Sequence, residues 1–369
     1  MAINDFETRA AWRAADLEAD RRWEFTVDDK ARRHMTEAIK KAFDPARPLF
    51  EYTREDFDLG PAWDTIAAAI EEAYHGGGIA LVHGLPRDGI SEQEFELMNW
   101  AVGLHSGVAR PQGKMSQYIS PVRDAGTNYR AANGRGYSSN AKLDFHTDGC
   151  DFVTLACYNK AKSGGQSMIS SSVTAFRIML EKRPDLAEVA HYTNYCFSRQ
   201  QEQAPDEAPF YAQPLIDFAD GRLFGKWNRN RVNSAQNLED VPKLTDKQRE
   251  AMEMLDRILS RPDVMYTMYL QPGDLQILNN HTMLHSRTDY VDHDEPEKKR
   301  LLSRLWMAPP DSVRLPESWG HFFRTTEPGA VRGGIRGHHH DEACRAFEHR
   351  QASALGMSIA APWDERQSA

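Results

Sequence analysis

The sequence predicts an α+β protein in which helices support a β-sandwich or barrel core. Two observations lead to this prediction. Strand-like segments separated by turns fill the middle and the last third of the chain. Helix-like segments bracket these strands but do not alternate with them one for one, so the regular βαβ order of a parallel sheet is absent.

The first hundred residues are mainly helical in pattern. Residues 1–45 are charged throughout, and we expect a helical N-terminal arm. Residues 61–78 form an Ala- and Glu-rich helix that ends in three glycines, and a strand follows at 78–85. Because these glycines follow a helix and precede a strand, they indicate a helix end and a turn, whereas a dinucleotide-binding loop has the opposite order. Ser91 and Glu94 are typical of a capping box that begins a second helix.

The remainder of the chain alternates between loops, strands and two further helices. Residues 105–140 are rich in Gly, Ser, Asn and Arg and predict a long loop, which in a compact domain is commonly functional. Helices are expected over 171–189 and in TDKQREAMEMLDRILSR. Strands are expected in LDFHTDG, FVTLACYN, VMYTMYL, DLQILNN, HTMLHSRTDY and RLLSRLWMAP. We therefore expect a main domain over 46–310 and a peripheral C-terminal tail over 311–369.

Composition excludes several classes of function. The chain has 369 residues, 40% of them apolar, and a net charge of −9, so it lacks the basic surface that nucleic-acid binding requires. No apolar run approaches the length of a membrane span, and the charged N-terminus indicates no signal peptide. The four cysteines show no CxxC spacing, which favours reduced thiols in a cytoplasmic protein. The sequence leaves homo-oligomerisation open.

A metal site is indicated by the stretch KLDFHTDGCDF. On a strand, His146 and Asp148 would point to the same face with Cα atoms roughly 6–7 Å apart. Two such side chains can converge on one ion. The alternative is a hydrogen-bonded His–Asp pair at the end of a strand.

A third ligand is available near the end of the domain. His281 and His285 lie in a strand pattern, where they would stand about 13 Å apart, so they cannot both bind this ion. We favour His285 because Arg300 and Arg304 follow it on one face of an apolar strand, and buried arginines are costly unless they meet anions. Solvent-exposed arginines on an edge strand are the alternative. Two histidines and one carboxylate form the facial triad of non-haem Fe(II) oxygenases, which leaves coordination positions open.

Four motifs together resemble the taurine dioxygenase-like (TauD/TfdA-like) family of Fe(II)/2-oxoglutarate-dependent dioxygenases. They are HTD at 146–148, AKSGGQS at 161–167, LNNHTMLHSRTDY at 278–290 and RLLSRLW at 300–306, and the resemblance runs from about residue 75 to 308. It implies a double-stranded β-helix, or jelly roll, with helices packed on one side, as the fold of the dioxygenase domain over 46–310.

The resemblance also implies roles for individual residues. His146, Asp148 and His285 would bind Fe(II). Ser167, where the family has threonine, would help Arg300 to hold the distal carboxylate of 2-oxoglutarate, and Arg304 would lie near the substrate. The acidic insert VDHDEPEKK before Arg300 leaves open which arginine binds which anion.

The reaction implied is hydroxylation of a C–H bond in a small or medium-sized, anionic organic substrate. 2-Oxoglutarate and O₂ would be consumed, and succinate and CO₂ released. The carboxylate of Asp148 separates the chain from the related halogenases, in which that position is empty. Two alternatives are a metal-dependent hydrolase that uses the same His₂–Asp site to activate water and a jelly-roll binding module without turnover.

Other residues are weaker candidates, and the sequence does not identify the substrate. Tyr129, Arg130, Tyr137 and Lys142 precede the His–Asp motif and are candidates for the substrate mouth, with ordinary surface-loop residues as the alternative. The histidines at 338–340 are expected in an exposed tail rather than in a metal site.

Overall fold

The computed structural model describes residues 9–126 and 139–360. Its main sheet is antiparallel except at one edge, where β1 runs parallel to β2. Strand β4 is the exception to the linear strand order, because it pairs with β16 outside that path. Along the sheet the strands are β1 (Glu24–Thr26), β2 (Ile79–His83), β13 (Leu275–Asn279), β5 (Phe152–Asn159), β16 (Leu301–Ala308) and β3 (Val108–Ala109), with β4 (Ile119–Val122) beside β16.

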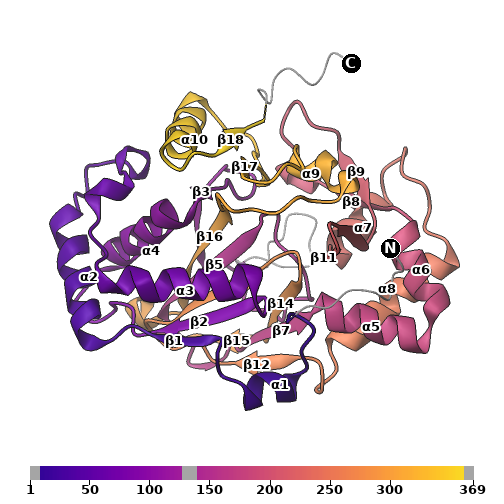
Figure 1. The fold of residues 1–369 in the computed structure, drawn as a ribbon, viewed down its shortest axis with the longest axis horizontal. Helices are drawn as coiled ribbons and strands as arrows, with labels where there is room; N and C mark the ends of the chain where they lie inside the picture. The colour runs from indigo at the N-terminus through magenta and orange to yellow at the C-terminus, as the bar shows by residue number, and fades with distance from the viewer. Residues whose placement is uncertain (1–8, 127–138, 361–369) are drawn as a thin grey trace.

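Both faces of the main sheet are buried, which explains why its strands are almost continuously apolar. In β2, Ile79 and Leu81 join one hydrophobic cluster, and the alternate residues Ala80 and Val82 join another. The helices on the Ala80 side are α2 (Asp29–Ala42), α3 (Pro61–His75) and α4 (Glu92–Ser106), seen at the left of Figure 1.

A smaller sheet packs against the opposite face of the main sheet. Its antiparallel strands are β12 (Tyr266–Met268), β7 (Ser167–Ser171) and β14 (Met283–Arg287). Ile169 and Met283 of this sheet share a core cluster with Val153 and Leu278 of the main sheet. The functional cavity described below lies between these two sheets. Beyond β7 lie helices α5 (Ser172–Lys182), α6 (Pro184–Tyr192) and α8 (Asp246–Leu259), at the right of Figure 1.

Short elements complete the described residues. The short helices are α1 (Ala14–Ala19), α7 (Arg229–Ala235) and α9 (Gly320–Phe323), and the longer α10 spans Glu342–Ala354. The paired short strands are β6 (Ser163–Gly164) with β15 (Tyr290–Val291), β8 (Tyr195–Ser198) with β9 (Phe210–Gln213), β10 (Ile216–Ala219) with β11 (Arg222–Gly225), and β17 (Ala330–Val331) with β18 (Ser358–Ile359). Among the described residues, no helix is both long enough and apolar enough to cross a membrane.

Two local predictions from the sequence, the capping box and the glycine turn, are confirmed by the structure. The hydroxyl of Ser91 accepts a hydrogen bond from the backbone N–H of Glu94, so the predicted capping box is confirmed. Helix α3 ends at His75, and Gly78 has a φ of +86° just before β2, so the glycines form a helix end and a turn as predicted. The four cysteines are free thiols.

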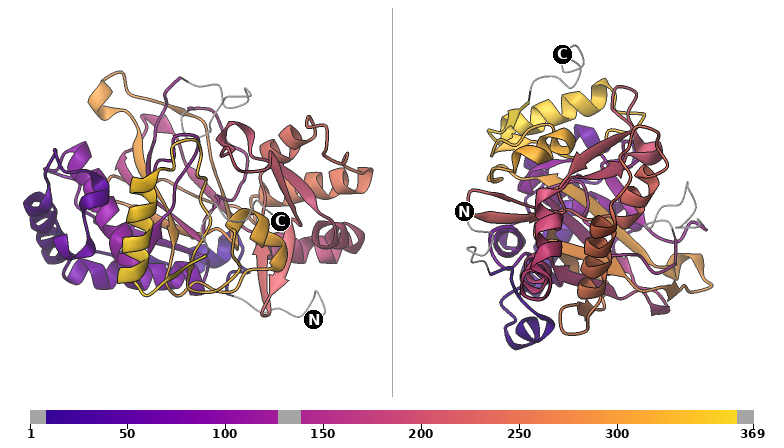
Figure 2. Two further views of the ribbon diagram at one scale, coloured as in Figure 1. Left: turned by 90° about the horizontal axis from the view of Figure 1, so that it is seen from above. Right: turned by 90° about the vertical axis from the view of Figure 1, so that its right-hand side faces the viewer.

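The predictions for both ends of the chain need correction. The N-terminal segment is not only helical, because β1 adds an edge strand to the main sheet. The expectation of a peripheral tail is wrong for residues 311–360, since Trp319 and Phe347 are each 1% exposed and Arg332 is fully buried. Figure 2 shows this C-terminal segment, in yellow, lying against the body of the molecule in both views. Its aromatic side chains supply the apolar surface that makes this packing favourable.

Candidate metal centre and substrate cavity

A backbone contact between distant segments brings the two histidines of the site together. His285 lies in the middle of β14, and His146 forms an isolated bridge to it rather than belonging to the regular strand that the sequence predicted. The His146 N–H donates to the His285 carbonyl at 3.0 Å, and the His285 N–H donates back at 2.9 Å. The imidazole centroids are consequently only 4.4 Å apart.

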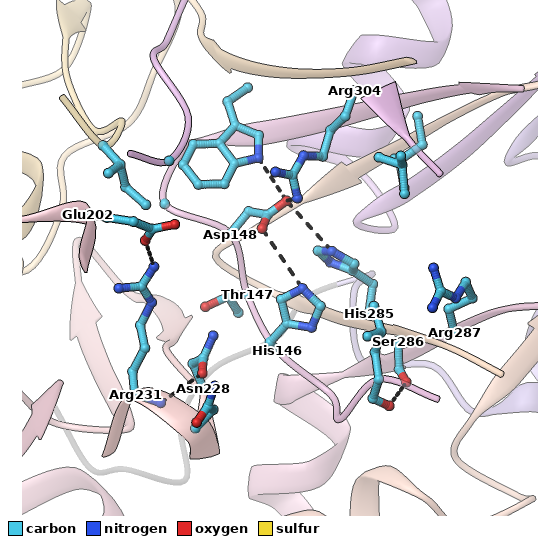
Figure 3. A pocket seen from close by; sticks show the side chains of 18 of the residues that line it. His146, Thr147, Asp148, Glu202, Asn228, Arg231, His285, Ser286, Arg287 and Arg304 are labelled. Atoms are coloured by element: carbon cyan, nitrogen blue, oxygen red, sulfur yellow. Dashed lines mark hydrogen bonds and ion pairs between the residues drawn. The ribbon is translucent and has the colours of Figure 1, made fainter. Parts of the chain in front are cut away.

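Asp148 completes a group of three possible metal ligands (Figure 3). Its carboxylate oxygens lie 3.9 Å from Nε2 of His146 and 3.7 Å from Nε2 of His285. One ligand atom from each of the three side chains lies within 4.8 Å of the other two. His281 does not join this group, because its Nε2 lies 3.0 Å from a carboxylate oxygen of Asp151.

Neighbouring groups fix the orientation of these ligands. Nδ1 of His146 lies 3.0 Å from the carbonyl oxygen of Asp144, which leaves Nε2 to face the site as an acceptor. The indole N–H of Trp306 donates to Asp148 Oδ2 at 2.8 Å, and the Asp148 backbone N–H donates to Asn280 Oδ1 at 3.0 Å. The carboxylate therefore has little freedom to rotate.

The protonation states also suit a divalent metal. Burial lowers the pKa of His146, and burial together with the positive charges of His146 and Arg304 lowers the pKa of His285 to about 3. Burial alone would raise the pKa of Asp148, but Arg304, the two histidines and the Trp306 N–H outweigh it and lower that pKa to about 2. At neutral pH the site therefore offers two neutral imidazoles and one carboxylate, a donor set that fits Fe(II).

Two predicted residues, Ser167 and Arg300, line the same cavity as the three ligands. Arg300 is buried, donates to the carbonyl oxygen of Val122 at 3.3 Å and lies over the ring of Tyr290 at 5.0 Å. Within the described ranges, its guanidinium has no ion pair. Ser167 lies on β7, and its hydroxyl donates to Oε1 of Gln276 at 3.0 Å.

Arg304 lies closer to the metal ligands than the sequence indicated. Its Nη1 is 3.5 Å from Asp148 Oδ2, and its Nε donates to Gln112 Oε1 at 2.8 Å. Arg287, which the sequence analysis did not select, also lines the cavity and donates to the carbonyl oxygens of Ser139 and Ala141, both at 2.6 Å. Its position two residues after His285 on β14 could have indicated it.

The other side of the cavity is built by residues that the sequence analysis missed. Arg231 forms an ion pair with the buried Glu202, and in Figure 3 this pair lies across the metal ligands from Arg287. Lys226 is also buried here, and burial next to Arg231 lowers its pKa to about 7. Further residues lining the cavity are Gln200, Tyr211, Asn228, Asn230, Phe322 and Ile335.

Of the four residues predicted at the substrate mouth, Lys142 is the one that the structure describes. Lys142 is exposed and is not among the residues that line the cavity. Tyr129, Arg130 and Tyr137 lie outside the described residues. The prediction of an exposed position holds for His338 and His339. It is wrong for His340, because its side chain is buried and lies 3.3 Å from a carboxylate oxygen of Glu348.

Comparison with known proteins identifies the family of this chain. Residues 42–306 match the family described as "Taurine catabolism dioxygenase TauD, TfdA family". The chain is 28% identical over 325 residues to FR-33289 synthase of Streptomyces rubellomurinus (strain ATCC 31215), a match that covers 85% of this chain and 94% of that protein.

Two solved structures share the fold. Asparagine oxygenase in complex with Fe(II), 2S,3S-3-hydroxyasparagine and succinate aligns with a TM-score of 0.59 and 18% identity, covering 78% of this chain and 93% of its own. The non-heme iron oxygenase OrfP in complex with Fe and alpha-ketoglutaric acid aligns with a TM-score of 0.54 and 13% identity, covering 77% and 94%. The predicted mixed architecture of helices and sheets is confirmed.

The family match spans most of the chain and contains all three candidate metal ligands. It also confirms the resemblance to Fe(II)- and 2-oxoglutarate-dependent dioxygenases that the four motifs indicated, and it gives no support to the hydrolase alternative. This protein therefore belongs to the taurine catabolism dioxygenase TauD, TfdA family.

Proposed function

We propose that this dioxygenase hydroxylates a C–H bond of a small or medium-sized organic anion, with 2-oxoglutarate and O₂ as co-substrates and succinate and CO₂ as products. The observation that carries the proposal is the group of His146, Asp148 and His285 in the wall of a cavity that also holds Arg300 and Lys226, two cations without an ion pair among the described residues. We also assign the two facing sheets to the double-stranded β-helix that the sequence resemblance implied.

His146, Asp148 and His285 would hold Fe(II). The metal, together with 2-oxoglutarate and O₂, would supply the oxidising power that protein side chains lack. The contribution of the chain is to present three ligands in fixed orientations. The bond from Trp306 holds Asp148, and the bond to Asp144 holds His146.

Arg300 and Ser167 would bind the distal carboxylate of 2-oxoglutarate. A buried guanidinium without an ion pair is costly, and a carboxylate would compensate that cost through charge-assisted hydrogen bonds. The Ser167 hydroxyl has a single proton, so it would donate to this carboxylate in place of Gln276 Oε1. Arg304 has a different task in this assignment, because its charge keeps Asp148 ionised.

The test is a titration of the Fe(II)-loaded protein with 2-oxoglutarate without oxygen, followed by the visible charge-transfer absorbance of the chelate. Arg300→Gln should weaken 2-oxoglutarate binding by about 10- to 100-fold, the value of one charge-assisted hydrogen bond. Arg257→Gln, which removes the same charge from a side chain that is 71% exposed, is the matched control. The proposal fails if the wild-type protein shows neither the absorbance band nor succinate release with any substrate.

A further inference from the structure

Lys226 is a buried cation beside the metal ligands, and it forms no ion pair with any residue that the structure describes. It follows β11, and residues 226–228 run alongside 146–148, with the Thr147 N–H donating to the Trp227 carbonyl at 2.9 Å. This pairing places Lys226 next to Asp148, where its ammonium donates to the backbone carbonyl oxygen at 3.3 Å. Within the described parts of the chain, no carboxylate oxygen lies within ion-pair distance of it.

The surroundings of Lys226 compensate its charge only in part, because the carboxylate of Asp148 favours the charged ammonium but lies beyond ion-pair distance. The ring of Phe322 lies 5.0 Å from its Nζ, and Arg231 contributes a second positive charge nearby. Glu202, the buried acid on this side of the cavity, already pairs with Arg231. Only 4% of the Lys226 residue surface is exposed, so solvent cannot replace the missing anion. A buried ammonium in such a place is costly unless a ligand pairs with it.

Two other cations of the cavity, Arg304 and Arg300, have different contacts from those of Lys226. Arg304 contacts the Asp148 carboxylate and Gln112. Arg300 contacts Val122 and Tyr290, the part of the cavity assigned above to 2-oxoglutarate. Lys226 is therefore the cation best placed for an anion that enters on the side of Arg231.

We propose that Lys226 binds the anionic group of the substrate and selects small organic anions over neutral molecules of the same shape. This assignment rests on the proposed function and makes it more specific. An ammonium is a compact charge with three donors, so it suits a carboxylate, a sulfonate or a phosphonate alike. The side chains of Gln200, Asn228 and Asn230 line the same cavity and can hydrogen-bond to the rest of the substrate.

Binding to the metal-free protein tests the assignment without turnover. The probes are acetate, methanesulfonate and methylphosphonate, each at fixed ionic strength, with dimethyl sulfone as the neutral analogue of methanesulfonate. A ligand that binds the native state raises the unfolding temperature, and the stabilisation grows with the logarithm of 1 + [L]/Kd. We expect at least one anion to stabilise the wild-type protein more than the neutral analogue does, and Lys226→Met to lower its affinity by about 10- to 100-fold.

Two further variants control for charge and folding. Lys30→Met removes one positive charge from the exposed face of α2 and should bind the probes as the wild type does. Lys226→Arg keeps the charge and should retain most of the anion effect. Equal stabilisation of the wild type and Lys226→Met, or no stabilisation of the wild type by any of the three anions, would overturn the assignment.

The 2-oxoglutarate titration separates this assignment from the proposed function. Lys226→Met should keep the charge-transfer band, because the residue is assigned to the substrate. If Lys226→Met loses the band but still binds the probe anion, then Lys226 only positions Asp148 and the assignment is wrong. If the wild type itself has no band, the proposed function fails, while the anion measurements on the metal-free protein still decide the role of Lys226.

Discussion

Replacing Arg332 with methionine should destabilise the metal-free protein by about 3–5 kcal/mol, the usual result of removing one partner from a buried ion pair. Arg332 and Asp151 are both fully buried. The Arg332 Nε lies 3.1 and 3.2 Å from the two carboxylate oxygens, and its Nη2 forms a further bond to Oδ1. Without the guanidinium, the side-chain bonds left to the Asp151 carboxylate among the described residues are those from Tyr74 at 3.1 Å and His281 at 3.0 Å.

The measurement is equilibrium unfolding in urea at pH 7, followed by circular dichroism. The double variant Asp151→Asn/Arg332→Met removes both charges, so it should lose clearly less stability than the sum of the two single variants. Arg314→Met, which breaks an exposed ion pair with Glu327, is the control and should change stability by less than about 1 kcal/mol. A loss below about 1 kcal/mol for Arg332→Met would show that the tail is not anchored through this pair.

Three further predictions concern the metal centre. His285→Ala should lose Fe(II), whereas His281→Ala should retain it, and metal analysis showing the reverse would overturn the choice of ligand. Trp306→Phe removes the donor to Asp148 and should weaken Fe(II) binding by about 10- to 100-fold in a metal titration; an unchanged affinity would contradict this role. The pKa of His285 is about 3 in the folded protein and about 6.5 when unfolded, so the unfolded state binds more protons between these values. Stability of the metal-free protein should therefore fall as the pH drops from 6.5 towards 3, and His285→Leu should flatten that dependence in urea unfolding.

The metal ligands could be predicted because their residue types and their spacing are visible in short stretches of the sequence. His146 and Asp148 are two residues apart, and the strand pattern around His285 excludes His281 from the same ion. The structure brings His146, Asp148 and His285 together, although a single backbone bridge replaces the regular strand expected at His146. The role of these residues as iron ligands stays a prediction.

The residues on the Lys226 side of the cavity could not be predicted in this way. Lys226, Glu202 and Arg231 come from segments without a motif. The pairing of residues 226–228 with 146–148 places Lys226, whereas Arg231 meets Glu202 because α7 packs against β8. Strand β1 has only three residues, too few to show a period, and it exists because β2 offers an unpaired edge. The tail is rich in polar residues, yet its few large aromatic side chains decide its burial.

The charges of the cavity now suggest how two anions can be held at one metal. Arg304 faces Asp148, and Arg231 faces Glu202, so each of these pairs is balanced within the protein. Among the described residues, Arg300, Lys226 and Arg287 form no ion pair, and Arg287 donates instead to the carbonyl oxygens of Ser139 and Ala141. Buried cations without an ion pair favour the uptake of anionic groups, and Arg300 and Lys226 are the two that we assign to ligands. Because Arg300 adjoins Val122 whereas Lys226 adjoins Asp148 and Phe322, 2-oxoglutarate and an anionic substrate can approach the metal ligands from different sides.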